Sequence, residues 1–137
     1  MSDSLGAIEG LITMQSRFAS KETMDRLESE IRARGLDVFA RIDHAAGATK
    51  VGLTLQPTEL IIFGNARGGT PLMQSAQTVG IDLPLKALVW EHEAGKAWIS
   101  YNEPSWIARR HAIAKKDAVL SKMKDTLVAM AKKAADG

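Results

Sequence analysis

Three side chains have the types and spacing that acid–base chemistry needs. Asp43 and His44 are adjacent, and a carboxylate beside an imidazole can orient the ring or raise its basicity, as general-base catalysis requires. Glu91 precedes His92 on a predicted strand, where neighbours point to opposite sides. The alternative is structural: Asp43 caps a helical turn and His44 lies at the surface. Asp43, His44 and Glu91 are therefore candidate catalytic residues with a competing structural interpretation.

A glycine-rich segment, Gly64 to Thr70, has the spacing of a phosphate-binding loop. Such loops need a lysine where this chain has Thr70, so nucleotide hydrolysis is excluded. Backbone N–H groups at the start of the next helix, with Arg67 nearby, could still bind a small anion. Asn65, Arg67 and Thr70 are thus candidate ligand-binding residues. The alternative is a glycine turn before a helix that Thr70 caps and Pro71 opens.

A second polar and aromatic group, Tyr101, Asn102 and Trp106, lies where a predicted strand leads into a helix. These side chains could line the mouth of a pocket for an aromatic ligand. The alternative is a helix cap followed by a tryptophan that closes the edge of the core.

Metal and cofactor chemistry has little support in the sequence. The chain has no cysteine, which excludes thiolate nucleophiles, disulfides and cysteine-ligated metals. His92 and Glu93 begin a zinc-peptidase pattern, but Lys96 replaces its second histidine. We therefore predict no metal and no cofactor, although a site built from the distant His44, His92 and His111 stays open.

Length and composition indicate one globular domain. The chain has 137 residues, 45% of them hydrophobic and 25% charged. We expect a core over residues 8–113 and an amphipathic helix over about 114–135. Because no membrane-spanning run or signal peptide is visible, we expect a cytoplasmic protein.

Charge is concentrated at the C-terminal end, where residues 104–137 hold eight basic and three acidic side chains. A basic arm could bind nucleic acid, but no aromatic residues interleave its lysines, so we expect no nucleic-acid partner. The simpler interpretation is a solvated helix face; a docking surface around Lys122 and Lys132 is the alternative.

Apolar spacing predicts the order β-α-β-(α)-β-α-β-β-α, an α+β fold with a mostly antiparallel five-stranded sheet and helices on one face. Ser20 is expected to cap the first helix and Gly35 to end it. Residues 36–43 alternate as a strand that places Val38 and Ile42 on one face and Arg41 on the other. Residues 59–63 are nearly all apolar, which indicates a strand buried on both faces. A helix is expected over about 71–79. Trp90 and Trp98 are expected to pair across a hairpin turning at 93–96.

Four segments of the sequence resemble the family called domain of unknown function 302: Ile42–His44, Leu60–Asn65, Leu83–Glu91 and Tyr101–Pro104. The resemblance covers residues 8–113. It implies a small α+β fold of the TATA-binding-protein-like type, often a bacterial homodimer, with no established activity.

Six positions match the family's pattern and become candidates by resemblance: Asp43, His44, Asn65, Pro84, Glu91 and Pro104. Two positions depart from it. Ala66 follows Asn65 where many members have proline, and Leu85 follows Pro84 where many have cysteine. Thiol chemistry is therefore excluded for this chain.

Three functions are compatible with these observations. The leading hypothesis is a non-enzymatic homodimer that binds a small anionic or aromatic ligand. The second is an enzyme with His44 or Glu91 as general base and Arg67 or Asn65 holding an anionic substrate. The third is a protein-interaction module that uses the basic C-terminal helix.

Overall fold

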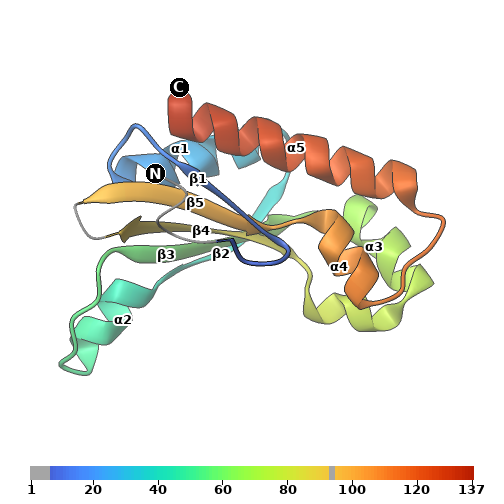
Figure 1. The fold of residues 1–137 in the computed structure, drawn as a ribbon, viewed down its shortest axis with the longest axis horizontal. Coiled ribbons are helices and arrows are strands. Elements are labelled where there is room, and N and C mark those ends of the chain that lie inside the picture. Colours follow the sequence, from blue (N-terminus) through green and yellow to red (C-terminus); the bar gives the residue numbers. More distant parts are fainter. Residues whose placement is uncertain (1–6, 93–94) are drawn as a thin grey trace.

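The computed structural model describes residues 7–92 and 95–137. Its strands form one antiparallel sheet in the order β1-β5-β4-β3-β2 (Figure 1). The strands are β1 (Leu11–Gln15), β2 (Asp37–Asp43), β3 (Thr58–Gly64), β4 (Leu85–His92) and β5 (Lys96–Asn102). The helices are α1 (Ser20–Ala33), α2 (His44–Lys50), α3 (Ala66–Ser75), the 3₁₀ helix η2 (Gln77–Ile81), α4 (Pro104–Arg110) and α5 (Asp117–Asp136).

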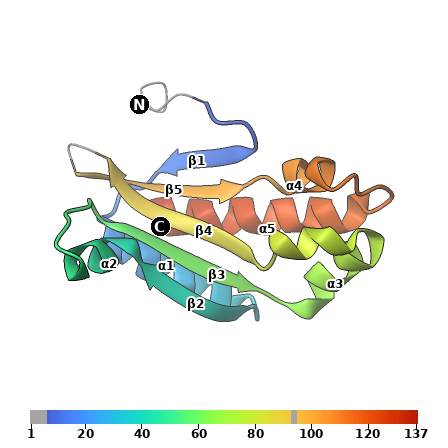
Figure 2. The same cartoon turned by 90° about the horizontal axis from the view of Figure 1, so that it is seen from below.

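Helices α1 and α5 lie side by side along one face of the sheet, whereas no helix of the described residues runs along the opposite face (Figures 1 and 2). This arrangement confirms the predicted α+β class with helices on one face. The residues expected to make the hairpin turn lie partly outside the described ones, but Gly95 has the expected positive φ of 73°.

The main core forms between this helical layer and the sheet. Ile61 and Phe63 of β3 are fully buried against Met24 and Ile31 of α1 and Met130 of α5. The apolar spacing of both helices predicted this contact, because residues three and four apart share one helical face. Gly35 follows α1 with φ 76°, as expected of the residue that ends a helix.

A second cluster lies at one end of the sheet, where α3, η2 and α4 meet the start of α5. Its buried members are Leu72, Val79 and Ile107, with Trp106 and Met123 packed against them. The predicted apolar stripe of the last helix is therefore shared between two clusters, because α5 is long enough to pass over both.

Strand β2 does not keep the predicted alternation. Its pairing with β3 shifts between Val38 and Ala40, so Phe39 occupies a β-bulge. Val38 packs against the main core, but beyond the bulge Arg41 points to the helical side and Ile42 to the other side. The expectation that Val38 and Ile42 share a face is wrong, because one inserted residue reverses the side on which later residues lie.

Helix α3 begins five residues before the predicted start. Its N-cap is Asn65, whose side-chain oxygen accepts a hydrogen bond from the Gly68 N–H at 2.9 Å. Thr70 and Pro71 therefore lie inside the helix and do not open it. The prediction was wrong because an asparagine cap holds Gly68 and Gly69 in a helix, despite their low intrinsic helix propensity.

Candidate functional site

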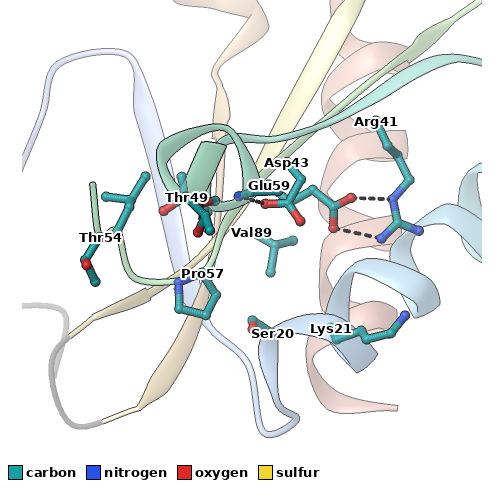
Figure 3. Close-up of a pocket in the computed structure, with 13 residues that line it drawn as sticks. Ser20, Lys21, Arg41, Asp43, Thr49, Thr54, Pro57, Glu59 and Val89 are labelled. Atoms are coloured by element: carbon teal, nitrogen blue, oxygen red, sulfur yellow. Dashed lines mark hydrogen bonds and ion pairs between the residues drawn. The ribbon is translucent and has the colours of Figure 1, made fainter. Parts of the chain in front are cut away.

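A polar cavity of about 540 Å³ lies between the start of α1, helix α2 and the segment that leads into β3 (Figure 3). Antiparallel pairing creates its floor, since Asp43 of β2 is opposite Glu59 of β3, and Glu59 is opposite Val89 of β4. We call this cavity the α1–α2 pocket; its thirteen lining residues include Ser20, Lys21, Arg41, Asp43, Thr49, Thr54, Pro57, Glu59 and Val89.

Arg41 is the electrostatic centre of the pocket wall. Its guanidinium donates from Nε and Nη2 to the two carboxylate oxygens of Glu59, at 2.8 and 2.7 Å. Its Nη1 donates to Asp25 at 3.0 Å and Glu28 at 2.9 Å on α1. These bonds hold the pKa of the Asp25 and Glu28 carboxyls below their usual values and raise the pKa of Arg41 itself. Arg41 thus ties two strands to α1 and neutralises part of a strongly acidic wall.

Ser20 connects the start of α1 with the end of β4. Its hydroxyl donates to a carboxylate oxygen of Glu91 at 2.7 Å. Ser20 was expected to cap α1, but the N-cap is Ala19, which has no side-chain hydrogen bond to offer. The prediction failed because the Ser20 hydroxyl has a stronger, charged acceptor across the sheet. Glu91 is therefore held beside the pocket by a hydrogen bond between elements distant in sequence.

Asp43 caps α2, as its structural interpretation predicts: one carboxylate oxygen accepts from the Ala46 N–H at 2.9 Å. His44 is the first residue of α2, and its side chain is exposed. Asp43 lines the pocket, whereas His44 is not among its lining residues. Asp43 is therefore a helix cap that lines the cavity, and His44 is an imidazole at the surface.

The residues that were predicted to bind a ligand lie at the opposite end of the sheet from the catalytic candidates Asp43 and Glu91. Asn65 is engaged as the cap of α3, while Arg67 and Thr70 are exposed on that helix. Tyr101 belongs to the main core, where its side chain is 5% exposed, and Trp106 packs into the second cluster. Asn102, at the end of β5, is half-buried.

The topology explains this division. In this antiparallel sheet, the C-terminal ends of β2 and β4 lie at one end of the sheet, and those of β3 and β5 lie at the other end. Asp43 and Glu91 are thus brought to the α1–α2 pocket, whereas Asn65 and Asn102 lie at the far end of the sheet. Pro84 and Pro104 also lie at that far end, before β4 and at the start of α4.

A separate charged cluster joins η2 to α4. Asp82 accepts from Arg110 at 2.9 and 3.0 Å and bonds the ring of His111, whose other nitrogen contacts the Thr78 hydroxyl at 2.9 Å. His111 is thereby placed far from His44 and His92. Among residues 7–92 and 95–137, no three acidic or histidine side chains gather into a group suited to a metal ion.

Sequence reasoning did not identify Arg41, Glu59, Ser20 or Thr54 as site residues. A signal existed for the first two, because opposite charges stand on neighbouring strands. The bulge at Phe39 and the exact register were needed to place them face to face.

Comparisons with known proteins provide two kinds of relative. The protein named "Fluoride-specific ion channel FluC 1" from Brucella suis biovar 1 is 50% identical over 104 residues, 76% of this chain and 41% of that protein. "Fluoride-specific ion channel FluC 2" from Brucella melitensis biotype 1 is also 50% identical over 104 residues, 38% of its length. The chain thus spans about two fifths of the length of these relatives. Within the part of the chain that the structure describes, every helix is too short or too polar to cross a membrane.

The fold has a solved counterpart: the crystal structure of an uncharacterized conserved DUF302 protein from Bacillus stearothermophilus. The two superpose with a TM-score of 0.83 at 18% identity, over 93% of this chain and 99% of the other. The more distant likeness to the TATA-binding protein stays a prediction. A family model, "Domain of unknown function DUF302", matches residues 12–131. The chain therefore belongs to the DUF302 family, as its sequence segments indicated.

Proposed function

We propose that this chain is a non-enzymatic, ligand-binding homodimer whose ligand occupies the α1–α2 pocket. The observation that carries the proposal is the cavity itself, about 540 Å³, which falls within the range of small-molecule sites. The carboxylates in and beside the pocket already hold neighbouring groups: Asp43 caps α2, Glu59 holds Arg41, and Glu91 beside the pocket accepts from Ser20. Groups held in this way favour binding over acid–base catalysis.

The charges around the pocket indicate the class of ligand. The wall of the pocket has two basic side chains, Lys21 and Arg41. More carboxylates lie in the pocket or beside it: those of Asp25, Glu28, Asp43, Glu59 and Glu91. The Thr49 and Thr54 hydroxyls add polar contacts, and Val89 and Pro57 add apolar ones. A small neutral or positively charged molecule with hydroxyl or amine groups fits this lining better than an anion does. The anionic ligand expected from the sequence rested on Asn65 and Arg67, which lie at the other end of the sheet.

Native mass spectrometry on gently purified protein tests the binding function, with a denatured sample as reference for the chain mass. We expect an excess mass that denaturation releases, and a thermal-shift response to polyols and amines exceeding that to carboxylates. Ala46→Phe, which narrows the pocket from α2, should abolish both signals. Ala118→Phe, on the exposed start of α5, is the matched control. Equal binding by wild type and Ala46→Phe would refute the pocket assignment.

A second candidate function is favoured by the relatives from Brucella. Half of the aligned residues are shared with a region of proteins named fluoride-specific ion channels. We infer that this chain acts beside a fluoride channel, as a cytoplasmic accessory domain. A strain lacking the chain should then be inhibited by lower fluoride concentrations than its parent, and re-expression should restore growth. Unchanged fluoride tolerance in that strain, with the channel gene intact, would contradict this candidate.

A further inference from the structure

The sheet face opposite α1 and α5 is unusually apolar for a face that no helix of residues 7–92 and 95–137 covers. In the usual antiparallel sheet, residues pointing away from the core are polar. Here the outward positions of β2, β3 and β4 carry mainly apolar side chains. We call this surface the open face; its apolar members are Ala40, Ile42, Leu60, Ile62, Leu88 and Trp90.

Aromatic residues on the open face are held rigidly. Trp90 stacks on Trp98 with ring centroids 6.2 Å apart, and Trp98 is only 3% exposed. The Trp90 indole N–H donates to the Ser100 hydroxyl at 2.9 Å, and Ser100 bonds Thr13 of β1 at 2.8 Å. A half-buried tryptophan fixed by packing and hydrogen bonds loses little entropy when a partner covers it, as in the anchors of stable interfaces.

A second apolar feature, residues 44–57, projects next to this face. We call it the α2 arm. Figure 1 shows α2 beyond the end of β2, on the side of the sheet away from α5. Among the described residues, eight large apolar side chains are exposed, and five of them lie between positions 39 and 55. They are Phe39 and Ile42 on β2, and Val51, Leu53 and Leu55 on the arm, which are 72%, 66% and 46% exposed.

The arm is also nearly free of charge. Lys50 is its one charged residue apart from the histidine His44. With 25% charged residues in the whole chain, a segment of this length would hold three or four. Burying the arm therefore removes few charges from water, so the cost of desolvation is small.

We propose that the occupant of the open face is a second copy of this chain, with the α2 arm of each copy packed on the open face of the other. The inference rests on the homodimer of the proposed function and assigns its interface. One chain carries both an apolar projection and an apolar surface, which a two-fold axis would bring together twice. Strand β3, whose residues 59–63 predict burial on both faces, is covered on one face only within a single chain.

The size of the surface meets what a stable dimer needs. Five strands spaced about 4.8 Å apart, with five residues in β1 and seven or eight in the other four at about 3.4 Å per residue, give a face of roughly 24 by 24 Å. A standard interface buries about 800 Å² on each partner, about a tenth of this chain's 8060 Å². The open face and the arm together supply that area.

Light scattering during gel filtration, at about 50 μM protein, tests the assignment. Wild type should elute as a dimer, and Leu53→Asp should raise the dimer Kd about a hundredfold or more, since it places a charge in an apolar contact. Ile81→Asp is the matched control, because Ile81 is 75% exposed on η2 at the other end of the molecule. It should remain dimeric, and circular dichroism should show that both variants are folded.

Cross-linking provides a second readout that does not depend on weakening the interface. The chain has no cysteine, so Leu53→Cys and Leu88→Cys each introduce a single thiol. After mixing, a short bifunctional thiol reagent should join one variant to the other. The control pair, Ile81→Cys with Leu88→Cys, should give no such product.

The outcomes separate the two levels of the proposal. A monomeric wild type refutes the homodimer and with it this interface. A dimer that persists in Leu53→Asp and gives no cross-link between positions 53 and 88 refutes the interface alone. If the wild type is a monomer that sediments with anionic lipid vesicles, and the Leu53→Asp variant does not sediment with them, the arm would be assigned to a membrane surface instead.

Discussion

Arg41 and Glu59 form a bidentate ion pair across the neighbouring strands β2 and β3, with both carboxylate oxygens of Glu59 within 2.8 Å of the Arg41 guanidinium. The Arg41 and Glu59 side chains are 26% and 23% exposed, so water screens the pair only in part. Because Arg41 also bonds Asp25 and Glu28 on α1, this pair connects the pocket wall to the helical layer.

Replacing Arg41 should therefore destabilise the fold more than removing an ordinary surface charge. In Arg41→Met, three carboxylates lose their shared cation, and we expect the free energy of unfolding to fall by about 2 kcal/mol. Arg32→Met removes a helical i,i+4 pair whose arginine is 59% exposed, and should cost less than about 0.5 kcal/mol. Urea unfolding at pH 7 measures both. Equal losses in the two variants would show that the Arg41 cluster has no special role.

Acid should weaken the same cluster. The Arg41 hydrogen bonds lower the pKa of Asp25 and Glu28 in the folded state. Below about pH 4.5 the unfolded chain therefore binds more protons at these sites than the folded chain, and stability falls as pH falls. In Arg41→Met this contribution is largely absent. The stability difference between wild type and the variant should thus shrink between pH 5 and pH 3, as measured by urea unfolding at several pH values. A constant difference would contradict the assigned cause.

Tyr101 provides a direct test of core burial. It is the single tyrosine of the chain, so ultraviolet absorbance of tyrosinate reports this residue alone. Burial, assisted by the nearby Glu103 carboxylate, raises the Tyr101 pKa above its usual value of 10.0. We expect the absorbance midpoint above pH 10 in the folded protein. Since the unfolded chain loses this proton first, stability should fall as pH rises beyond 10, and Tyr101→Phe should reduce that fall. A midpoint at 10 in folded protein would exclude the buried position.

Gly10 should be intolerant of any side chain. It has φ 77°, and a Cβ there would overlap the ring of Trp106. Gly10→Ala is expected to lower the free energy of unfolding by about 3 kcal/mol, from backbone strain and displacement of the ring. The matched control is Gly47→Ala in α2, where nothing lies within 4 Å, which should stabilise the protein by about 0.5 to 1 kcal/mol. Thermal and urea unfolding of both variants measure these effects. A Gly10→Ala variant as stable as wild type would rule out the close contact between Gly10 and the Trp106 ring.

Elements that local interactions fix were predictable from the sequence, whereas positions that depend on distant residues were not. The spacing of Met24, Leu27 and Ile31 defines a helix face without knowledge of any partner. The Asp43 cap was predictable for the same reason, because donor and acceptor are three residues apart. The failures at Thr70 and Ser20 arose where two capping residues competed, or where a distant Glu91 offered a better acceptor.

The sequence by itself determined the α+β class, the strand and helix order and the family, because these depend on local periodicity and on short segments that resemble the family. Only the tertiary structure decided which candidates meet. Antiparallel pairing places Asp43 and Glu91 at one end of the sheet and Asn65 and Asn102 at the other end. The bulge at Phe39 turns the Arg41 side chain toward α1. The register between strands far apart in sequence sets these positions, and a one-residue shift would move every later side chain to the other face.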